Sequence, residues 1–587
     1  MPRDLATFGF LGVEKSLTGR RWVGPDPEDD RQTERLVQQT GLPEATARVL
    51  ANRRVGPDEA EGFLAPTLRD LLPDPRTLHD MEAAAGRLVA AVEGREAIAI
   101  FADYDVDGGA SAALLLAWLR ELGHTATLYI PDRIDEGYGP NAPAMERLAR
   151  DHDLIICVDC GTLSHDALAA AVGADVVVLD HHLGGETLPP ALAVVNPNRQ
   201  DEDGSLAHLC AAGVVFLCLV EANRQRRAKG LAEPKLLPLL DLVALATVAD
   251  VAPLVGVNRA FVLQGLKVMA QRKRPGLVAL SDVARLDAPP SAYHLGYVLG
   301  PRVNAGGRIG AADLGARCLA ATDAHEAEAM AERLDQLNTE RRQIEEAVRE
   351  AALKQAQERG FDAPLVWAAG DGWHPGVVGI VAARLKEATN RPAIVIGLDG
   401  DVGKGSGRSV GGIDLGAAVQ KTALEGLLLK GGGHRMAAGL TVAREGLEAA
   451  MDRLADLLDA QGAGGIGPAD VRIDGLLMPG AATVDLVEQL EAAGPYGQSA
   501  PAPRFAFPDM RILRAGRVGE SHLKLTFGDG MGAKLDAISF SAYEGPLGPA
   551  LEGHGGAPHH LAGKLELNHW NGRISVQLRL TDAARVA

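Results

Sequence analysis

Three aspartates stand at alternate positions in FADYDVDG, residues 101–108. They are Asp103, Asp105 and Asp107, and they follow the apolar run AIAIF. Carboxylates this close repel one another unless a cation neutralises them, so the spacing predicts a cation site. A helix-capping acidic turn is the simpler alternative. A calcium loop of the EF-hand type is excluded, because no glutamate follows at the twelfth position.

Three further segments also carry residues that bind metals. ICVDCG contains Asp159, VVVLDHHLGG contains Asp180, His181 and His182, and the helix-like LVALATVADVAPL contains Asp250. Aspartate and histidine ligands without cysteine suit Mn²⁺ or Mg²⁺ better than structural zinc. Five or six such ligands are enough for two ions about 3.5–4 Å apart, which can clamp the attacking and leaving oxygens of a phosphate.

Buried strands are predicted to deliver these side chains. The apolar segments 97–105, 124–130, 153–159 and 174–180 read as strands, with helical segments such as 109–122 between them. Alternating strands and helices favour a mostly parallel sheet covered by helices on both faces. Such sheets place their sites at the carboxyl ends of the strands, so the acids and histidines are expected to meet there.

The remaining pattern predicts several domains in an α/β chain. A 3,4 spacing of apolar residues over 322–358 predicts one long helix, and alternating short strands after about residue 505 predict a small β-barrel of the OB type. The expected parts are an N-terminal cap, a parallel-sheet domain that carries the acids and histidines, a connecting helix, a smaller α/β domain, and a linker with the barrel, at 1–75, 76–321, 322–360, 361–460 and 461–587.

The composition is that of a globular protein, with 47% hydrophobic and 23% charged residues. No apolar run is long enough to span a membrane, and five cysteines are too few for a disulfide framework, so a cytoplasmic setting is expected.

The net charge of −18 argues against nucleic-acid binding, but this charge is an average over the whole chain. Residues 501–587 hold ten Lys or Arg against eight Asp or Glu. Cys157 and Cys160 form a CxxC pair, yet redox chemistry is disfavoured because Cys157 lies in an apolar strand.

The order of the motifs resembles a known family. DYDVDG, VDCG, DHH and the aspartate after VALATVA are similar to the motifs of the DHH phosphoesterases. LVALATVADVAPL and GPRVNAGGRIG (300–310) resemble the branch of that family that degrades single-stranded DNA from the 5′ end. DGWHPGVVGIVAARL (371–385), GKGSGRS (403–409) and KGGGHRMAAG (430–439) resemble the DHH-associated domain, and the C-terminal region resembles the OB-fold of the same branch.

The resemblance implies roles for individual residues. Metal ligands or their immediate shell would be Asp103, Asp105, Asp107, Asp159, His181 and Asp250. His182 is expected among the catalytic residues, either on a metal or on substrate, and Asp180 would orient a histidine. Phe101 stands where many members of the family have a histidine ligand, so the first metal would rely on the three aspartates. Arg435 stands where small residues are common, beside an intact His434.

Glycine-rich segments are expected to bind the DNA backbone. A loop in GKGSGRS would offer Ser406 and Arg408 to a phosphate, and one in KGGGHRMAAG would offer His434. GPRVNAGGRIG would add Arg302, Asn304 and Arg308, although any single glycine loop can be a mere tight turn. On the barrel, the candidate contacts for a single strand are Arg511, Arg514, Arg517, Lys524, Phe527 and Trp570. The alternative is that most of these rings fill the barrel.

The resemblance implies a metal-dependent exonuclease that degrades single-stranded DNA 5′→3′ to 5′-mononucleotides in repair and recombination. Two divalent ions, Mn²⁺ or Mg²⁺, would be its cofactors. A single-strand-binding protein and a helicase are expected partners, and we expect a monomer without membrane contact. No Walker A motif is present, so nucleotide-driven unwinding is not indicated.

Three alternatives remain at this point. A DHH phosphodiesterase of small nucleotides would need no long DNA track, which the barrel argues against. An inactive single-strand-binding scaffold would be expected to have lost ligands, whereas the acid and histidine set is intact. Deacylation of mischarged tRNA would use the associated domain alone and leaves the aspartates unexplained.

Overall fold

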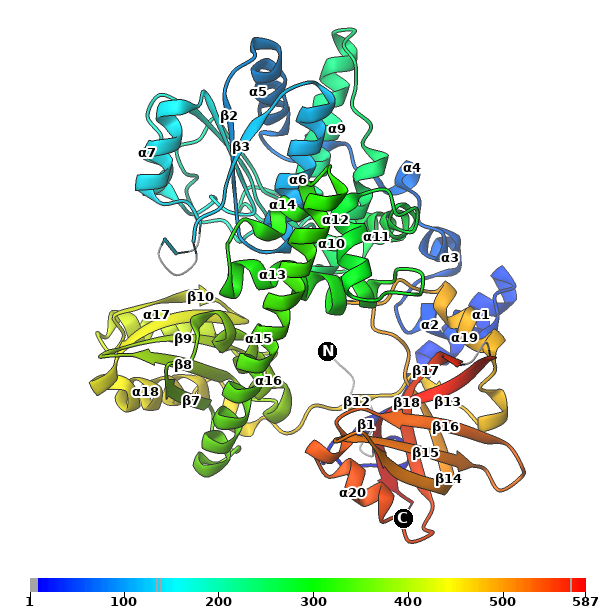
Figure 1. Cartoon of the computed structure of the whole chain (residues 1–587). Helices are drawn as coiled ribbons and strands as arrows, with labels where there is room; N and C mark the ends of the chain where they lie inside the picture. Colours follow the sequence, from blue (N-terminus) through cyan, green and yellow to red (C-terminus); the bar gives the residue numbers. More distant parts are fainter. Residues whose placement is uncertain (1–8, 133–135, 138, 571–572, 587) are drawn as a thin grey trace. The chain divides into compact units, whose positions relative to one another are not determined.

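The computed structural model describes residues 9–132, 136–137, 139–570 and 573–586. The chain divides into two compact units (Figure 1). The central unit comprises Thr67–Ile466 with Gly497–Ser499. The barrel unit comprises Met1–Pro66, Gly467–Tyr496 and Ala500–Ala587.

The central unit contains a parallel sheet, as the sequence predicts, and this sheet has five strands rather than the four predicted. The strand order is β3-β2-β4-β5-β6, and every neighbouring pair is parallel. The strands are β2 (Ile98–Ala102), β3 (Ala126–Tyr129), β4 (Leu154–Val158), β5 (Asp175–Leu179) and the unexpected β6 (Ala193–Val195). All residues of β2 and β4 are buried, because helices cover both faces of the sheet.

Helices α7 (Ala142–Asp151) and α8 (His165–Ala169) pack on one face of this sheet in a core that includes Phe101 and Cys157. The other face is covered by α5 (Met81–Gly94), α6 (Val106–Glu121) and α9 (Ala211–Ala228). The helices that follow are α10 (Leu240–Ala249), α11 (Gly256–Met269), α12 (Pro275–Val283), a π-helical turn (His294–Leu299), α13 (Gly300–Ile309) and α14 (Leu314–Ala320). The short α4 (Leu68–Leu71) lies at the start of the unit.

The predicted long helix is α15 (Ala324–Arg359). It begins at Asp323, whose side chain accepts a hydrogen bond from the Glu326 N–H at 2.9 Å, and Gly360 follows its end. Its first half packs against α12 and α13, and its second half against α16 (Pro375–Thr389). A single helix therefore joins the parallel sheet to the second α/β domain.

The second domain holds a mixed sheet of order β10-β11-β9-β8-β7, in which β7 and β8 are the parallel pair. Its strands are β7 (Val366–Asp371), β8 (Ala393–Asp399), β9 (Val402–Arg408), β10 (Lys430–His434) and β11 (Ala437–Ala443). Two more helices, α17 (Leu415–Leu424) and α18 (Leu447–Asp459), complete the domain.

The three glycine-rich segments are not the loops that the sequence predicts. GKGSGRS forms strand β9, KGGGHRMAAG forms the β10–β11 hairpin, and GPRVNAGGRIG forms helix α13. The glycines permit close packing instead. A Cβ at Gly405 would lie 2.9 Å from the Ile396 and Leu440 side chains, and one at Gly307 would lie 2.6 Å from the Tyr104 carbonyl oxygen.

The barrel unit contains a closed barrel, because β14 pairs with both β15 and β17. The circuit β14-β15-β16-β18-β17 has one parallel pair, β16–β18, and this is the connectivity of an OB-fold. The strands are β14 (Phe505–Val518), β15 (His522–Gly528), β16 (Lys534–Ser539), β17 (His559–Trp570) and β18 (Arg573–Arg585), with α20 (Leu547–Glu552) between β16 and β17. The short β13 (Gly475–Leu476) pairs with β14.

The N-terminal residues expected as a cap pack with this barrel. Strand β1 (Trp22–Val23) pairs in parallel with β12 (Val471–Arg472), and the Trp22 Nε1–H donates to Asp582 at 3.0 Å. Leu36 and Leu50 share a core with Phe507 of the barrel. Leu36 lies in helix α1 (Pro27–Thr40) and Leu50 in α2 (Glu44–Ala51), and Ala60 of α3 (Pro57–Leu64) belongs to the same core. Helix α2 also contacts α19 (Val484–Ala492).

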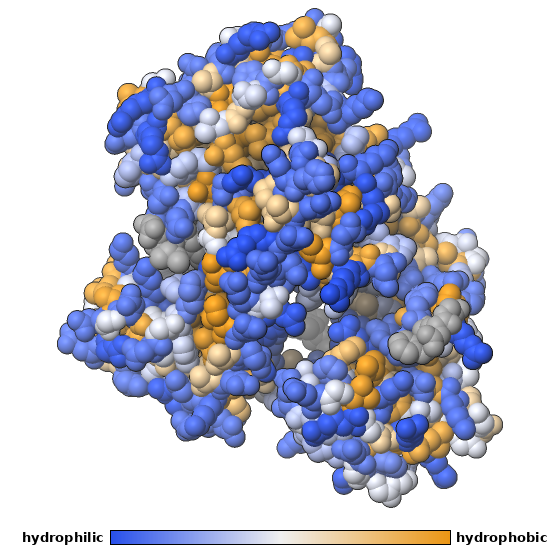
Figure 2. Space-filling model, viewed as in Figure 1, coloured by the Kyte–Doolittle hydropathy of each residue, from blue (hydrophilic) through white to orange (hydrophobic). Residues whose placement is uncertain are grey.

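Hydrophilic residues make up most of the visible surface in Figure 2, and apolar side chains gather there in smaller patches. Among the described residues, no helix combines the length and the apolar character needed to cross a membrane.

Candidate metal centre

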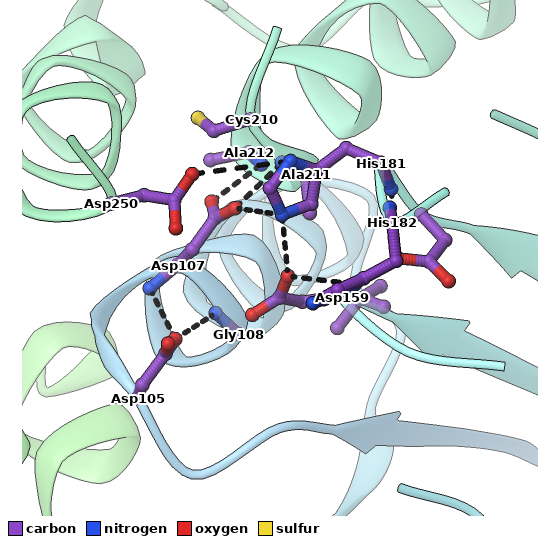
Figure 3. Close-up of polar contacts among 12 residues, drawn as sticks. Asp105, Asp107, Gly108, Asp159, His181, His182, Cys210, Ala211, Ala212 and Asp250 are labelled. Atoms are coloured by element: carbon purple, nitrogen blue, oxygen red, sulfur yellow. Dashed lines mark hydrogen bonds and ion pairs between the residues drawn. The ribbon is translucent and has the colours of Figure 1, made fainter. Parts of the chain in front are cut away.

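The first motif lies where strand β2 gives way to helix α6, and Figure 3 shows two of its carboxylates, Asp105 and Asp107, at the start of that helix. Asp103 directly follows β2 and is buried. Asp105 is the N-cap of α6, and its side chain accepts hydrogen bonds from the backbone N–H groups of Asp107 (2.8 Å) and Gly108 (3.2 Å). The motif therefore folds as a helix cap that keeps three carboxylates at one edge of the sheet.

Asp107 points away from its own helix toward the start of α9. Its carboxylate accepts hydrogen bonds from the backbone N–H groups of Ala211 (2.6 Å) and Ala212 (2.8 Å), the first two residues of α9. A helix N-terminus carries partial positive charge, which stabilises an anion there. The sequence pattern contained no sign of this pairing, since more than a hundred residues separate the partners.

His181 lies among three carboxylates. Its Nε2 is 3.2 Å from Asp159 Oδ1 and 3.7 Å from Asp107 Oδ2, and its Nδ1 is 3.9 Å from Asp250 Oδ2. Asp159 directly follows β4 with a left-handed backbone (φ 60°), and Asp250 ends α10. Figure 3 shows these side chains converging from different elements. We call Asp103, Asp105, Asp107, Asp159, His181 and Asp250 the metal-site cluster.

Asp180 holds the ring of the second histidine, His182, in line with the prediction that it orients a histidine. Its carboxylate accepts hydrogen bonds from His182 Nδ1 at 2.8 Å and from the His181 backbone N–H at 2.7 Å. Burial alone would raise the pKa of Asp180, but the hydrogen bonds from His182 and Thr162 outweigh it and hold that pKa below its usual range. Burial lowers the pKa of His182, whereas the bond and charge of Asp180 raise it to about 9.

Two asparagines that the sequence reading missed support the histidine loop. Asn196 Nδ2 donates to Thr162 Oγ1 (2.8 Å) and to the His182 carbonyl (2.7 Å), and Asn198 Nδ2 donates to the His181 carbonyl (2.6 Å). Both follow the unpredicted strand β6. The signal was present as AVV followed by Asn-Pro-Asn, a short apolar strand that ends in polar residues like the strands before it.

The metal-site cluster is electrostatically suited to cations. Burial raises the pKa of Asp107, Asp159 and Asp250, and neighbouring carboxylates raise it further, although the charge of His181 lowers the pKa of Asp107 and that of His182 lowers the pKa of Asp250. A divalent cation would relieve this repulsion. Three sets of residues each bring their ligand atoms within 4.8 Å of one another: Asp103–Asp105–Asp159, Asp107–His181–Asp250 and Asp159–His181–His182. The third set shares Asp159 with the first and His181 with the second. The donor set of carboxylates and imidazole fits Mn²⁺ or Mg²⁺.

The CxxC pair is not part of this chemistry. Cys157 and Cys160 are buried free thiols, and burial raises the pKa of both. Protonated thiols neither bind metal well nor exchange disulfides.

The residues of GPRVNAGGRIG contact protein groups. Arg302 Nε is 2.8 Å from Asp335 Oδ1 of α15, and Arg308 Nη1 donates to the Gly376 carbonyl at 3.1 Å. Asn304 Oδ1 accepts the backbone N–H of Val106 at 3.0 Å, at the first residue of α6. Asn304 therefore helps to fix the helix that carries Asp107.

The residues of the second domain form a compact polar group. Arg408 Nη1 donates to Ser406 Oγ at 3.0 Å and to the Gly407 carbonyl at 2.8 Å. Gly379 of α16 lies directly over them, since a Cβ there would be 3.1 Å from Ser406 Oγ. Burial lowers the pKa of His434, and the charges of Arg408 and His182 lower it further. The group thus lies within electrostatic reach of the histidine loop.

On the barrel, the residues predicted to contact DNA differ in how exposed their side chains are. Arg511, Arg514 and Lys524 are exposed on β14 and β15. Arg517 lies over the Tyr543 ring, 3.9 Å from its centroid. Phe527 is a correction: its side chain is fully buried, because its strand register turns it inward against other core residues such as Phe507. The side chain of the sixth candidate, Trp570, lies outside the described part of the chain.

Comparison with known families matches most of the chain. Residues 97–247 match the DHH family, N-terminal domain; residues 362–460 match the DHHA1 domain; and residues 473–582 match the RecJ OB domain.

Individual proteins and structures resemble the chain over most of its length. The single-stranded-DNA-specific exonuclease RecJ of Dickeya dadantii is 39% identical over 561 residues, which cover 92% of this chain and 95% of that protein. The protein of the same name from Escherichia coli is 36% identical with the same coverage. Among solved structures, RecJ of Thermus thermophilus in complex with Mn²⁺ has a TM-score of 0.79 at 30% identity, covering 96% of this chain and 79% of that one. An exonuclease RecJ bound to manganese has a TM-score of 0.57 at 34% identity, covering 65% of this chain and 95% of that one.

Proposed function

The chain belongs to the RecJ family of single-stranded-DNA-specific exonucleases, and from this premise we propose that it hydrolyses single-stranded DNA 5′→3′ to 5′-mononucleotides with two divalent metal ions. The observation that carries the proposal is the metal-site cluster, in which one ligand set shares Asp159 with a second set and His181 with a third. Overlapping sets suit a pair of adjacent ions better than one. The OB barrel favours a long single strand over a small nucleotide as substrate.

The cluster fits two Mn²⁺ or Mg²⁺ ions, which when bound would activate a water and stabilise the charge that develops on the phosphate. The protein's part is to hold the ligands in place. Asp107 is fixed by the start of α9, and Asp105 by its own helix cap. Asp180 holds His182 through Nδ1, and the same atom lies 4.0 Å from Asp159 Oδ1.

The second domain would set the direction of digestion along the strand. Ser406, Arg408 and His434 offer hydroxyl, guanidinium and imidazole donors within electrostatic reach of His182. A terminal 5′ phosphate bound there would place the following phosphodiester at the metal-site cluster. Helix α15 contacts both domains and would keep this spacing constant.

End-labelled oligonucleotides test the proposed function. With Mn²⁺, a single strand labelled at its 5′ end should release labelled mononucleotide at once, whereas a 3′ label should stay on long fragments until late. A blunt duplex should be resistant. If a strand blocked at its 5′ end were digested from its 3′ end, the proposed polarity would be wrong.

Arg408→Ala should lower activity on a 5′-phosphorylated strand about tenfold more than on a 5′-hydroxyl strand. The charge-assisted contact to the phosphate is worth about 1.5 kcal/mol or more, and the 5′-hydroxyl strand never makes it. The measurement is kcat/KM on both substrates, with Lys421→Ala on the exposed surface of α17 as the control. An equal loss on both substrates would show that Arg408 does not read the terminal phosphate.

Membership of this family also supports a proposal about the cellular process and the protein partners. We propose that it acts as a monomer in DNA repair and recombination in the cytoplasm, together with a single-strand-binding protein and a helicase. Co-purification with each partner on a gapped DNA would test this.

A further inference from the structure

Two exposed tyrosines stack on each other in the central unit. Tyr293 and Tyr297 are 52% and 71% exposed, and their ring centroids lie 5.2 Å apart at an interplanar angle of 25°. The chain holds only seven tyrosines among 587 residues, so two exposed and adjacent rings call for an explanation. Large aromatic side chains left in water often mark a binding surface.

The rings are held in a fixed arrangement before any ligand arrives. Tyr293 directly precedes the π-helical turn His294–Leu299, and Tyr297 lies within it. The His294 ring meets the Tyr293 ring edge to face at 5.9 Å and 71°, and His294 Nδ1 accepts a hydrogen bond from the Ser291 backbone N–H at 3.1 Å. Rings fixed in this way lose little conformational entropy when a ligand stacks on them.

The π-helical turn is anchored to the helices that build the metal-site cluster. A Cβ at Gly296 would lie 3.2 Å from the Val248 side chain, and one at Gly300 would lie 3.2 Å from Ala249 Cβ. Both contacts are to the last turn of α10, which ends at Asp250. The turn continues directly into α13, whose Asn304 supports the start of α6. π-Helical turns inside helices are frequent at functional sites.

We propose that Tyr293 and Tyr297 form a stacking platform for a base of the single strand near the metal-site cluster. The ligand is a nucleobase in a single-stranded nucleic acid, because every base has a flat π-face while bases in a duplex are already stacked. The platform would therefore favour single strands without reading their sequence. This proposal rests on the proposed function and adds two binding residues to it.

Binding without hydrolysis tests the platform. Oligonucleotides with single 2-aminopurine substitutions along the strand are titrated with the protein in EDTA. The fluorescence of at least one position should be quenched by the wild-type protein, and the quenching should vanish with the Tyr293→Ala/Tyr297→Ala double variant. The double variant should bind the strand about tenfold more weakly, since one stacked base contributes about 1–3 kcal/mol.

Three further variants separate stacking from simple contact. Tyr293→Phe/Tyr297→Phe keeps both rings and should bind within about twofold of wild type, because stacking needs no hydroxyl. Tyr293→Leu/Tyr297→Leu keeps apolar bulk and should behave like the alanine variant. Leu237→Ala, at another exposed apolar position of the same unit, should have no effect.

The platform is wrong if the alanine variant keeps wild-type affinity and quenching, or if the leucine variant binds as well as wild type. The second result would assign the patch to an apolar partner such as a protein. Wild-type protein that neither binds nor cuts single strands would instead overturn the proposed function itself. The two failures are therefore distinguishable.

Discussion

Asp159→Asn is expected to lower the rate of DNA hydrolysis by about 10³-fold or more. Asp159 belongs to two of the three ligand sets and lies 3.2 Å from His181 Nε2, so its loss affects every ion that the cluster would hold. A metal contribution of several kcal/mol corresponds to at least this factor, at about 1.4 kcal/mol per tenfold change. The rate is measured in a single turnover at saturating enzyme and Mn²⁺, so that binding does not limit it.

Thermal unfolding provides the control for this variant. Burial and nearby carboxylates raise the pKa of Asp159, so its charge destabilises the metal-free folded state at neutral pH. Without metal, Asp159→Asn should therefore unfold at the same temperature as wild type or a higher one. Mn²⁺ should raise the melting temperature of wild type more than that of the variant. A folded Asp159→Asn variant that keeps more than about a tenth of the wild-type rate would contradict the role of Asp159.

Metal removal tests the same site in the wild-type protein. EDTA should abolish wild-type activity and added Mn²⁺ should restore it.

Asp180→Asn is expected to reduce activity by about 10–100-fold without removing a ligand, as for other residues that orient metal ligands. The carboxylate accepts from Thr162 Oγ1 (2.6 Å), from His182 Nδ1 (2.8 Å) and from the His181 backbone N–H (2.7 Å). An amide offers only one acceptor oxygen, so buried donors would be left unsatisfied. That should also lower the free energy of unfolding by about 1–3 kcal/mol.

Mn²⁺ titration followed by urea unfolding separates the two effects of Asp180→Asn. The variant should need more Mn²⁺ for half-maximal activity, because the histidine loop is less well fixed. Asp282→Asn is the matched control, since Asp282 pairs with Arg272 at 2.6 Å where both side chains are exposed, and such surface pairs contribute little. Unchanged Mn²⁺ dependence and stability in Asp180→Asn would show that its hydrogen bonds do not organise the site.

Much of the metal-site cluster could be predicted because most of its residues lie in short segments with a recognisable pattern. An apolar run of strand length followed by Asp, as at Asp159 or Asp180, marks the carboxyl end of a buried strand. Once the strands are parallel, these ends must meet at one edge of a sheet, so the side chains converge whatever the rest of the chain does. The same argument applies to Asn196 after β6, but a strand of only three residues gives too short an apolar run to stand out in the sequence.

Other features depended on which distant surfaces pack together. The glycine-rich segments looked like loops because glycine permits tight turns, but neighbouring side chains occupy the space where a Cβ would stand, and close packing uses the same residue. Phe527 was a candidate for stacking because an aromatic residue in a strand can face either side of the barrel wall. A shift of one position in the strand register moves a side chain from the outer face to the inner face, and the sequence of one strand does not fix that register.

The sequence by itself determined the parallel sheet and the order of the elements and predicted a metal-dependent chemistry, since residue type, spacing and periodicity are properties of short segments. Tertiary structure alone decided that Asp107 binds the start of α9, that the N-terminal helices share a core with the C-terminal barrel, and that two tyrosines stack beside the last turn of α10. Each of these contacts joins chain segments or side chains whose local patterns are compatible with several partners. The partner is selected only when the whole chain packs and its buried polar groups find hydrogen bonds.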